Sequence, residues 1–290
     1  MRPAHLLRVA DVLTAFRTAY RSLLHNGNAQ AGNLAYLSLL TVFPFFVLVV
    51  IVAGVVWRTE DGMRAVIKLL SVLPPSVAEL LNGPVSEVVA ERASGGLITF
   101  GILVILWTVT NYAEAVRNII REAHGEAQRA AVWRHRFLSL AIVLASVFLM
   151  LVALASQLFL SGTAAILAEL VPAGALPVPG AVFSVVLPAF SLFGGLCLAF
   201  YGLTMRKSRR WHWIWPGALV IAAGWILVTM AMPLVLAEFR KWSLAYGSLT
   251  SVIVTLIYFW ILGLWLIFGV HFNAALAKAG QTRLKGRLEA

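Results

Sequence analysis

The chain has 290 residues, of which 61% are hydrophobic and only 12% are charged, and its mean hydropathy is +0.88. A soluble domain of this length usually carries about twice that charged fraction, so the composition excludes an ordinary soluble protein. The formal net charge of +11 would suit a nucleic-acid partner, but the membrane topology derived below accounts for the basic excess.

Long apolar runs without charge dominate the chain. Runs of about 18 or more such residues are typical of transmembrane helices. Six are present, at residues 33–57, 93–113, 137–160, 181–205, 214–237 and 247–277. The predicted fold is therefore all-α: a polytopic membrane protein with six transmembrane helices in a single domain, residues 1–290.

The N-terminal arm, residues 1–28, contains a predicted amphipathic helix over residues 6–24. Its apolar residues recur at helical spacing: Leu6, Val9, Leu13, Phe16, Tyr20 and Leu23. Arg17 and Arg21 fall elsewhere on the helix. Such a helix suits the inner surface of a membrane, and it equally suits a position packed beneath the helical bundle.

The first predicted span carries an unusual number of polar groups for a membrane helix. They are Asn33, Ser38 and Thr41, followed by a proline, Pro44. Pro44 has no N–H and clashes with the carbonyl of Leu40, so we expect a kink there. Ser38 and Thr41 lie close enough to satisfy the freed carbonyl. A kink of this kind either lines a cavity or only shapes the packing.

The segment between the first two spans, residues 58–94, is predicted to lie outside the membrane. Ser76 and Glu79 form a capping-box pattern just after two prolines, Pro74 and Pro75. We expect two short amphipathic helices there, which could cover the outer mouth of the bundle.

The second predicted span holds a polar stripe. Trp107, Asn111, Glu114 and Asn118 recur at spacings of four, three and four residues, which places them on one face of a helix. Glu114 can pair with Arg117 or Arg121 along the next turns. An ionisable residue near membrane depth is a candidate functional residue. The alternative is that Glu114 already lies at the level of the lipid headgroups.

Basic residues set the predicted orientation. Of the 23 lysines and arginines, 17 lie in the N-terminal arm, in the second-to-third and fourth-to-fifth connections, and in the tail, residues 278–290. The positive-inside rule places this side in the cytoplasm, together with both termini. The six remaining basic residues fall outside, where seven acidic residues accompany them.

Three stretches of the chain resemble the YihY/BrkB family of bacterial inner-membrane proteins. They are NLAYLSLLTVFPFF (33–46), WTVTNYAEAVRNII (107–120) and YGSLTSVIVTLIYFW (246–260) with the closing GVHFNA (269–274). The resemblance implies six spans with cytoplasmic termini and, as suggested for the family, export or handling of lipid-like molecules. One member gave the family its virulence-factor name, and some members carry a ribonuclease label.

The resemblance also singles out residues near the last span. Tyr246 and Ser248 begin it, and they are secondary site candidates together with His271 and Asn273. Members of the family often have glutamate where His271 stands, so a carboxylate role does not transfer to that position. His271 and Asn273 point about 200° apart on a helix, so they are not a paired site, and we interpret both as residues at the inner membrane interface.

Enzymatic function finds little support in the sequence. The single cysteine, Cys197, excludes an intramolecular disulfide. His124 points away from Glu122 and Glu126 on a helix, and we identify no metal site, cofactor site or catalytic residue.

Three functions remain open at this stage. The first is transport or handling of an amphipathic or lipid-like substrate, with membrane lipids as partners. The second is a non-catalytic membrane organiser that binds partners through its basic cytoplasmic face. The third, a membrane-bound hydrolase or ribonuclease, is the least supported. Nucleic acid is not expected as a partner, and oligomerisation stays open. The candidate cavity residues are Asn33, Ser38, Thr41, Pro44, Trp107, Asn111, Glu114, Arg117 and Asn118.

Overall fold

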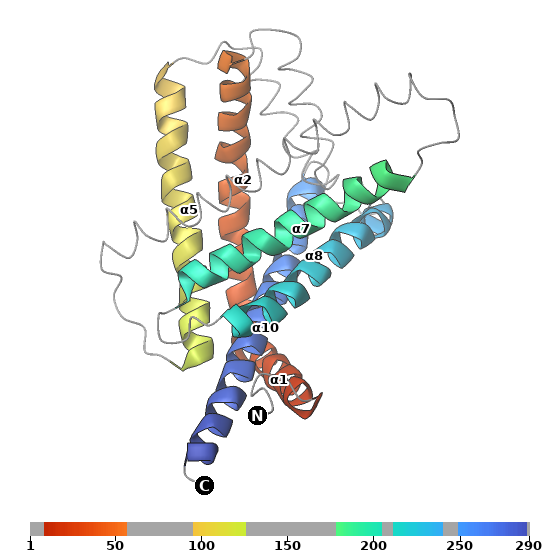
Figure 1. Ribbon diagram of the computed structural model, residues 1–290. Coiled ribbons are helices and arrows are strands. Elements are labelled where there is room, and N and C mark those ends of the chain that lie inside the picture. Colours follow the sequence, from red (N-terminus) through yellow and green to blue (C-terminus); the bar gives the residue numbers. More distant parts are fainter. Residues whose placement is uncertain (1–8, 57–94, 126–177, 205–210, 240–248, 289–290) are drawn as a thin grey trace. The chain divides into compact units, whose positions relative to one another are not determined.

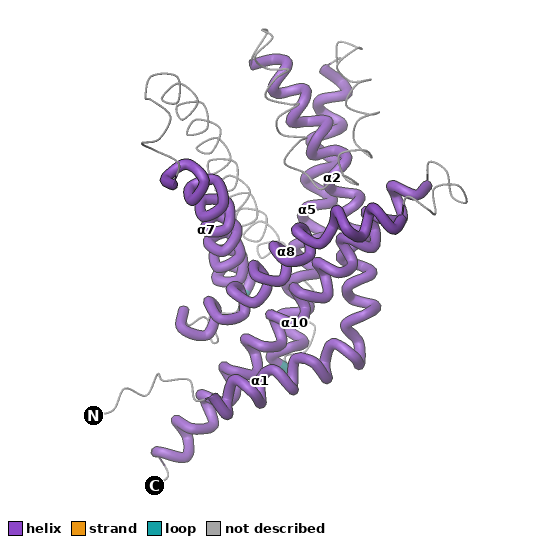
Figure 2. Tube along the Cα trace, turned by 90° about the vertical axis from the view of Figure 1, so that its right-hand side faces the viewer, coloured by secondary structure: helices purple, strands orange, loops and turns teal. Residues whose placement is uncertain are grey.

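The computed structural model describes residues 9–56, 95–125, 178–204, 211–239 and 249–288 (Figure 1). These ranges are helical and contain no strand, as Figure 2 shows. The helices are α1 (Val9–Ser22), the π-helix η1 (Leu23–Gly27), α2 (Asn28–Val56), α5 (Gly95–His124), α7 (Val178–Leu203), α8 (Trp211–Phe239) and α10 (Leu249–Leu288). The predicted all-α class is confirmed.

Five of the predicted spans correspond to long helices. α2, α5, α7, α8 and α10 have 29, 30, 26, 29 and 40 residues. At a rise of about 1.5 Å per residue, each is longer than the hydrocarbon core of roughly 30 Å. The remaining predicted span, 137–160, and the external segment, 58–94, lie outside the described residues, so the total of six stays a prediction.

α8 and α10 have the length and composition needed to cross a membrane, over Ile214–Val235 and Leu249–Gly280. α8 also exposes large apolar side chains along one face. These side chains belong to Trp215, Leu219, Leu227, Met230 and Leu234. A face of this kind is costly in water and favourable against lipid chains, so it fits a helix that borders the bilayer.

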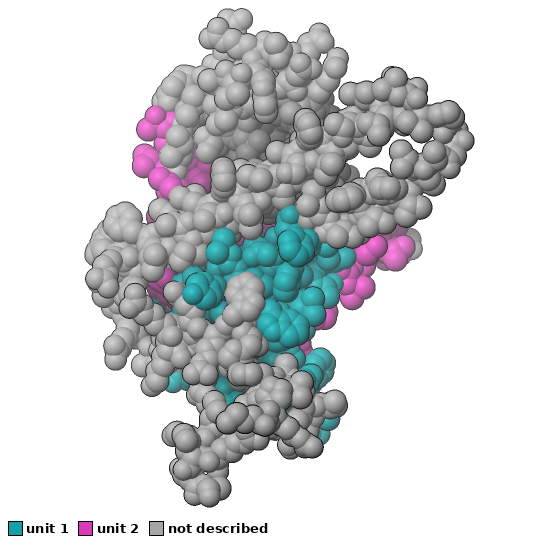
Figure 3. Space-filling model, in the orientation of Figure 1, with its two compact units in different colours: residues 1–19, 120–226, 269–290 teal, residues 20–119, 227–268 magenta. Residues whose placement is uncertain are grey.

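The chain divides into two compact units (Figure 3). Unit 1 comprises residues 1–19, 120–226 and 269–290, and unit 2 comprises residues 20–119 and 227–268.

Small residues and hydrogen bonds join the helices of unit 2. A Cβ at Gly263 on α10 would lie 3.2 Å from the backbone of Ala31 on α2, so these helices approach closely there. Three residues earlier, the indole N–H of Trp260 donates to Asn28 Oδ1 at 3.0 Å. The contact of α2 with α10 therefore combines a close approach of Gly263 to Ala31 with the hydrogen bond between Trp260 and Asn28.

Candidate functional site

The polar stripe of α5 is present in unit 2. Glu114 Oε2 lies 3.6 Å from a guanidinium nitrogen of Arg117, one turn further along, and the two side chains are only 20% and 6% exposed. The predicted pairing of these residues is confirmed. Glu114 Oε2 is buried and has no hydrogen-bond partner among the described residues, so the carboxylate retains acceptor capacity for another group.

The stripe does not belong to the packed face of α5. The buried residues Ile105, Thr108, Ala113, Val116 and Ile119 mark the packed face. At about 100° per residue, Glu114 lies half a turn from Ile105, on the far side of the helix. Trp107 is 64% exposed, and Asn111 and Asn118 are partly exposed. The stripe thus presents amide and carboxylate groups on the less packed side of α5, which is predicted to span the membrane.

The candidates on α2 have different environments. Asn33 is exposed, and Ser38 shares a hydrogen bond with Tyr112 of α5. Thr41 Oγ1 donates to the carbonyl oxygen of Leu37 at 2.7 Å, one turn back, and not to that of Leu40. α2 continues as one helix through Pro44, whose side chain is outside the description. Among the candidates of α2 whose side chains are described, Ser38 is the one with a hydrogen bond to α5, and a cavity between these two helices stays a prediction.

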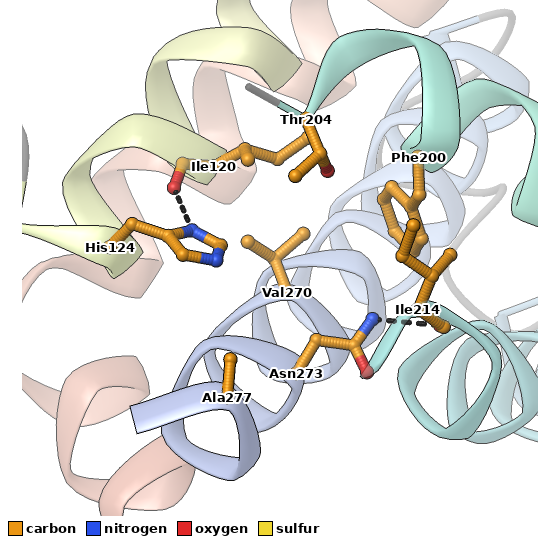
Figure 4. Close-up of a pocket in the computed structure, with 8 residues that line it drawn as sticks. All are labelled: Ile120, His124, Phe200, Thr204, Ile214, Val270, Asn273 and Ala277. Atoms are coloured by element: carbon orange, nitrogen blue, oxygen red, sulfur yellow. Dashed lines mark hydrogen bonds between the residues drawn. The ribbon is translucent and has the colours of Figure 1, made fainter. Parts of the chain in front are cut away.

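Unit 1 contains a small cleft that the sequence did not predict (Figure 4). It is lined by Ile120 and His124 of α5, Phe200 and Thr204 at the end of α7, Ile214 of α8, and Val270, Asn273 and Ala277 of α10. Its water-accessible volume is about 20 Å³, which holds about one water molecule.

The four helices reach this cleft consistently with the predicted topology. α5, α7 and α10 contribute residues from their C-terminal parts, and α8 contributes Ile214 from its first turn. In the predicted topology all four of these parts lie on the cytoplasmic side. If that topology holds, the cleft lies at the inner end of the helices, where apolar side chains meet polar ones.

Asn273 holds α10 against α8. Its Oδ1 accepts the N–H of Gly217 at 2.7 Å, and its Nδ2 donates to the carbonyl of Ile214 at 2.9 Å. The residue is only 9% exposed. Both ends of its amide are therefore used between α8 and α10, and the position of Asn273 at the inner membrane interface stays a prediction.

Glycines make this approach possible. A Cβ on Gly217 would overlap Asn273 and the carbonyl of Gly269, and a Cβ on Gly269 would overlap Ile221. Close crossings at small residues, with a polar side chain bonding across them, are typical of membrane helices. In the sequence, this contact could have been suspected from Gly217, Gly269 and Asn273, which are two glycines and an asparagine within apolar spans.

The C-terminus of α5 is capped next to the cleft. Gly125 adopts the left-handed conformation (φ 74°), and its N–H donates to the carbonyl of Glu122 at 2.9 Å. Lys278 Nζ donates to the carbonyl of Ala123 at 3.1 Å, which places a positive charge at the negative end of the helix.

His124 presents its imidazole to the cleft (Figure 4). Its Nδ1 lies 2.8 Å from the carbonyl oxygen of Ile120. Because a carbonyl only accepts, Nδ1 carries the proton in this bond, and the second ring nitrogen is the one that can bond to a guest. His271 does not line the cleft with Asn273, as their spacing predicted.

Two of the candidates, Tyr246 and Ser248, lie outside the described residues. No group of three His, Cys, Asp or Glu side chains able to hold a metal ion occurs within the described ranges.

The comparisons with known proteins confirm the resemblance seen in the sequence. The chain matches the family model of virulence factor BrkB over residues 18–290. It is 28% identical, over 260 residues, to a Bacillus subtilis (strain 168) protein named as ribonuclease-like, YfkH, and the match covers 89% of this chain and 93% of the relative. No solved structure matches the chain.

Proposed function

This chain belongs to the virulence factor BrkB family, and on that premise we propose that it moves or handles an amphipathic, lipid-like substrate in the inner membrane of a bacterium. It is an all-α polytopic membrane protein. The excess of arginine and lysine on one side supports a topology with both termini in the cytoplasm.

The polar stripe of α5 is the observation that carries this proposal. Amide and carboxylate groups on the less packed side of a membrane helix are costly unless they meet another polar group. Asn111 and Asn118 offer donors and acceptors, and Glu114 Oε2, although ion-paired with Arg117, accepts no hydrogen bond from the described residues. These groups could take the polar part of an amphiphile, while exposed apolar residues such as Trp107 and Leu103 take its hydrocarbon part.

The cleft of unit 1 gives secondary support. It combines an imidazole and a hydroxyl with isoleucine, valine and phenylalanine side chains at the predicted inner end of the helices. In the observed volume it holds about one water molecule and no lipid headgroup, so an amphiphile would enter only after the helix ends separate.

Replacement of Asn111 tests the proposal. Asn111→Leu removes the central amide at similar size and should leave insertion unchanged while the lipid distribution between leaflets shifts toward that of a deletion strain. Thr110→Val is the matched control, because the Thr110 hydroxyl bonds only to its own helix, at the Leu106 carbonyl. The measurement is leaflet-resolved lipid analysis of cells complemented with each variant at equal expression.

Two other results would contradict the proposal. Full complementation by Asn111→Leu would reject the stripe as the substrate surface. If function instead disappeared when the basic connection 206–210 was changed from arginine to lysine, with insertion intact, a partner-binding membrane organiser would be the correct function.

We propose that the chain is not an enzyme, although a relative is named ribonuclease-like. The proposal rests on the absence of a recognisable catalytic motif from the sequence. Purified protein incubated with single-stranded RNA should release no more fragments than a mock preparation. RNA cleavage that copurifies with the protein through two further separations would overturn this.

A further inference from the structure

We infer that α1 is a docking surface for the anionic headgroup layer of the membrane and lies in the plane of the bilayer. The inference concerns residues that precede the first span and does not depend on the substrate of the protein.

α1 has a large apolar face that remains mostly exposed. Leu13, Phe16 and Tyr20 are 71%, 55% and 52% exposed. Around the helix axis these three residues fall within about 60° of one another, so they form one continuous surface. The sequence allowed two positions for this helix, on the inner membrane surface or packed beneath the bundle. Burial of these three side chains beneath the bundle is not observed.

A different face of α1 contacts the protein. Ala15 and Ala19 are 2% and 0% exposed, and they lie on one flank of the apolar face. The helix therefore buries two small residues, while its large apolar side chains remain more than half exposed. This division excludes the explanation that α1 is merely a poorly packed core helix.

Charge identifies the occupant of the exposed face. Arg17 and Arg21 are exposed and lie on the other flank of the apolar face, next to Leu13 and Tyr20. An apolar face bordered by arginine suits the boundary between phosphate headgroups and acyl chains. A soluble protein partner would have no reason to match this arrangement more closely than the bilayer itself.

Chain continuity places the bilayer within reach. α1 ends at Ser22, and the five residues of η1 lead directly into α2, the first membrane helix. The exposed face is thus tethered within a few residues of the membrane surface, on the side that the basic residues assign to the cytoplasm.

A fluorescence experiment on the full-length protein tests the inference. In a Cys197→Ala background, an environment-sensitive dye is attached to Leu13→Cys or Thr18→Cys, and the protein is placed in nanodiscs of phosphatidylethanolamine and phosphatidylglycerol with spin-labelled lipids as quenchers. Thr18 is exposed and lies nearly opposite the apolar face, so it is the matched control site. The dye at residue 13 should shift to shorter wavelength and be quenched by the lipids, and the dye at residue 18 should remain in water.

Substitution of the two arginines completes the test. Each arginine near an anionic surface is worth about a fivefold factor in binding, so Arg17→Gln with Arg21→Gln should weaken docking about 25-fold. The phosphatidylglycerol fraction needed for half-maximal quenching at residue 13 should rise accordingly, and lysine at both positions should restore it.

Three results would overturn the inference. A water-exposed dye at residue 13 in anionic nanodiscs would show that the face stays free. A dye shielded from water without lipid quenching would show that protein covers it. Equal quenching at residues 13 and 18 would show that the whole helix is immersed and has no surface orientation.

Discussion

Gly217→Ala should destabilise the protein because it separates α8 from α10. The added methyl group would overlap the backbone carbonyl of Gly269 and the amide of Asn273, which two hydrogen bonds hold in place. Overpacking at such a site costs about 1–3 kcal/mol. Asn273 would also lose the geometry of its bonds to Gly217 and Ile214, and interhelical hydrogen bonds in membranes are worth about 0.6 kcal/mol each.

The higher helix propensity of alanine partly offsets this loss of stability. Alanine is favoured over glycine in a helix by roughly 1 kcal/mol. The net expectation for Gly217→Ala is therefore a loss of roughly 1–3 kcal/mol in the free energy of unfolding. Gly194→Ala on α7 is the matched control, because a Cβ at Gly194 meets no atom within 4 Å, and it should be neutral or slightly stabilising.

The assay is unfolding of the purified protein in mixed micelles, by titration with a denaturing detergent and measurement of tryptophan fluorescence. A double-mutant cycle with Asn273→Ala refines it: because Asn273 is one of the two groups that the methyl overlaps, the two changes should be less than additive. Equal stability of Gly217→Ala and Gly194→Ala would refute the close crossing of α8 and α10.

Three further predictions use other parts of the structure. Gly125→Ala should cost about 1 kcal/mol of stability in the same unfolding assay, because Gly125 has a left-handed φ of 74°, and Gly125→Asn should cost less; equal effects would contradict a conformational cause. Tyr258→Phe should cost roughly 0.6–1.7 kcal/mol, because it removes the 3.0 Å bond to Thr229, and Thr229→Val should add nothing to it. A cysteine placed at Ser76 should react with a membrane-impermeant thiol reagent in cells with a permeabilised outer membrane, and one placed at Ser208 should not; the reverse pattern would reject the orientation assigned from charge.

The helices were predictable because membrane helices are encoded by composition. A charge-free run such as 214–237 has no soluble alternative of comparable stability, so its position follows from hydropathy alone, and α8 covers it. The ion pair of Glu114 with Arg117 was also predictable, since a spacing of three residues fixes their proximity on any helix.

Contacts between helices were not predictable in the same way. From the sequence, Asn273 was interpreted as a residue at the inner membrane interface, with no partner identified. Its actual environment depends on Gly217, which is 56 residues earlier, and no local pattern identifies the facing helix. The same limit applied to the cleft, whose lining residues come from four separate helices.

The length of α10 determines how far the C-terminus stands from the bilayer. Its 40 residues extend about 60 Å, which is twice the hydrocarbon thickness of roughly 30 Å. In the predicted orientation the final turns of α10 therefore extend beyond the headgroups on the cytoplasmic side, and their sequence includes Lys278, Arg283, Lys285 and Arg287. In that orientation, a fluorescent protein or affinity tag fused after α10 would be held clear of the headgroups, whereas the same tag at the N-terminus would be attached beside α1, which we propose to dock on the membrane surface. Fusions for purification or imaging should accordingly be placed at the C-terminal end.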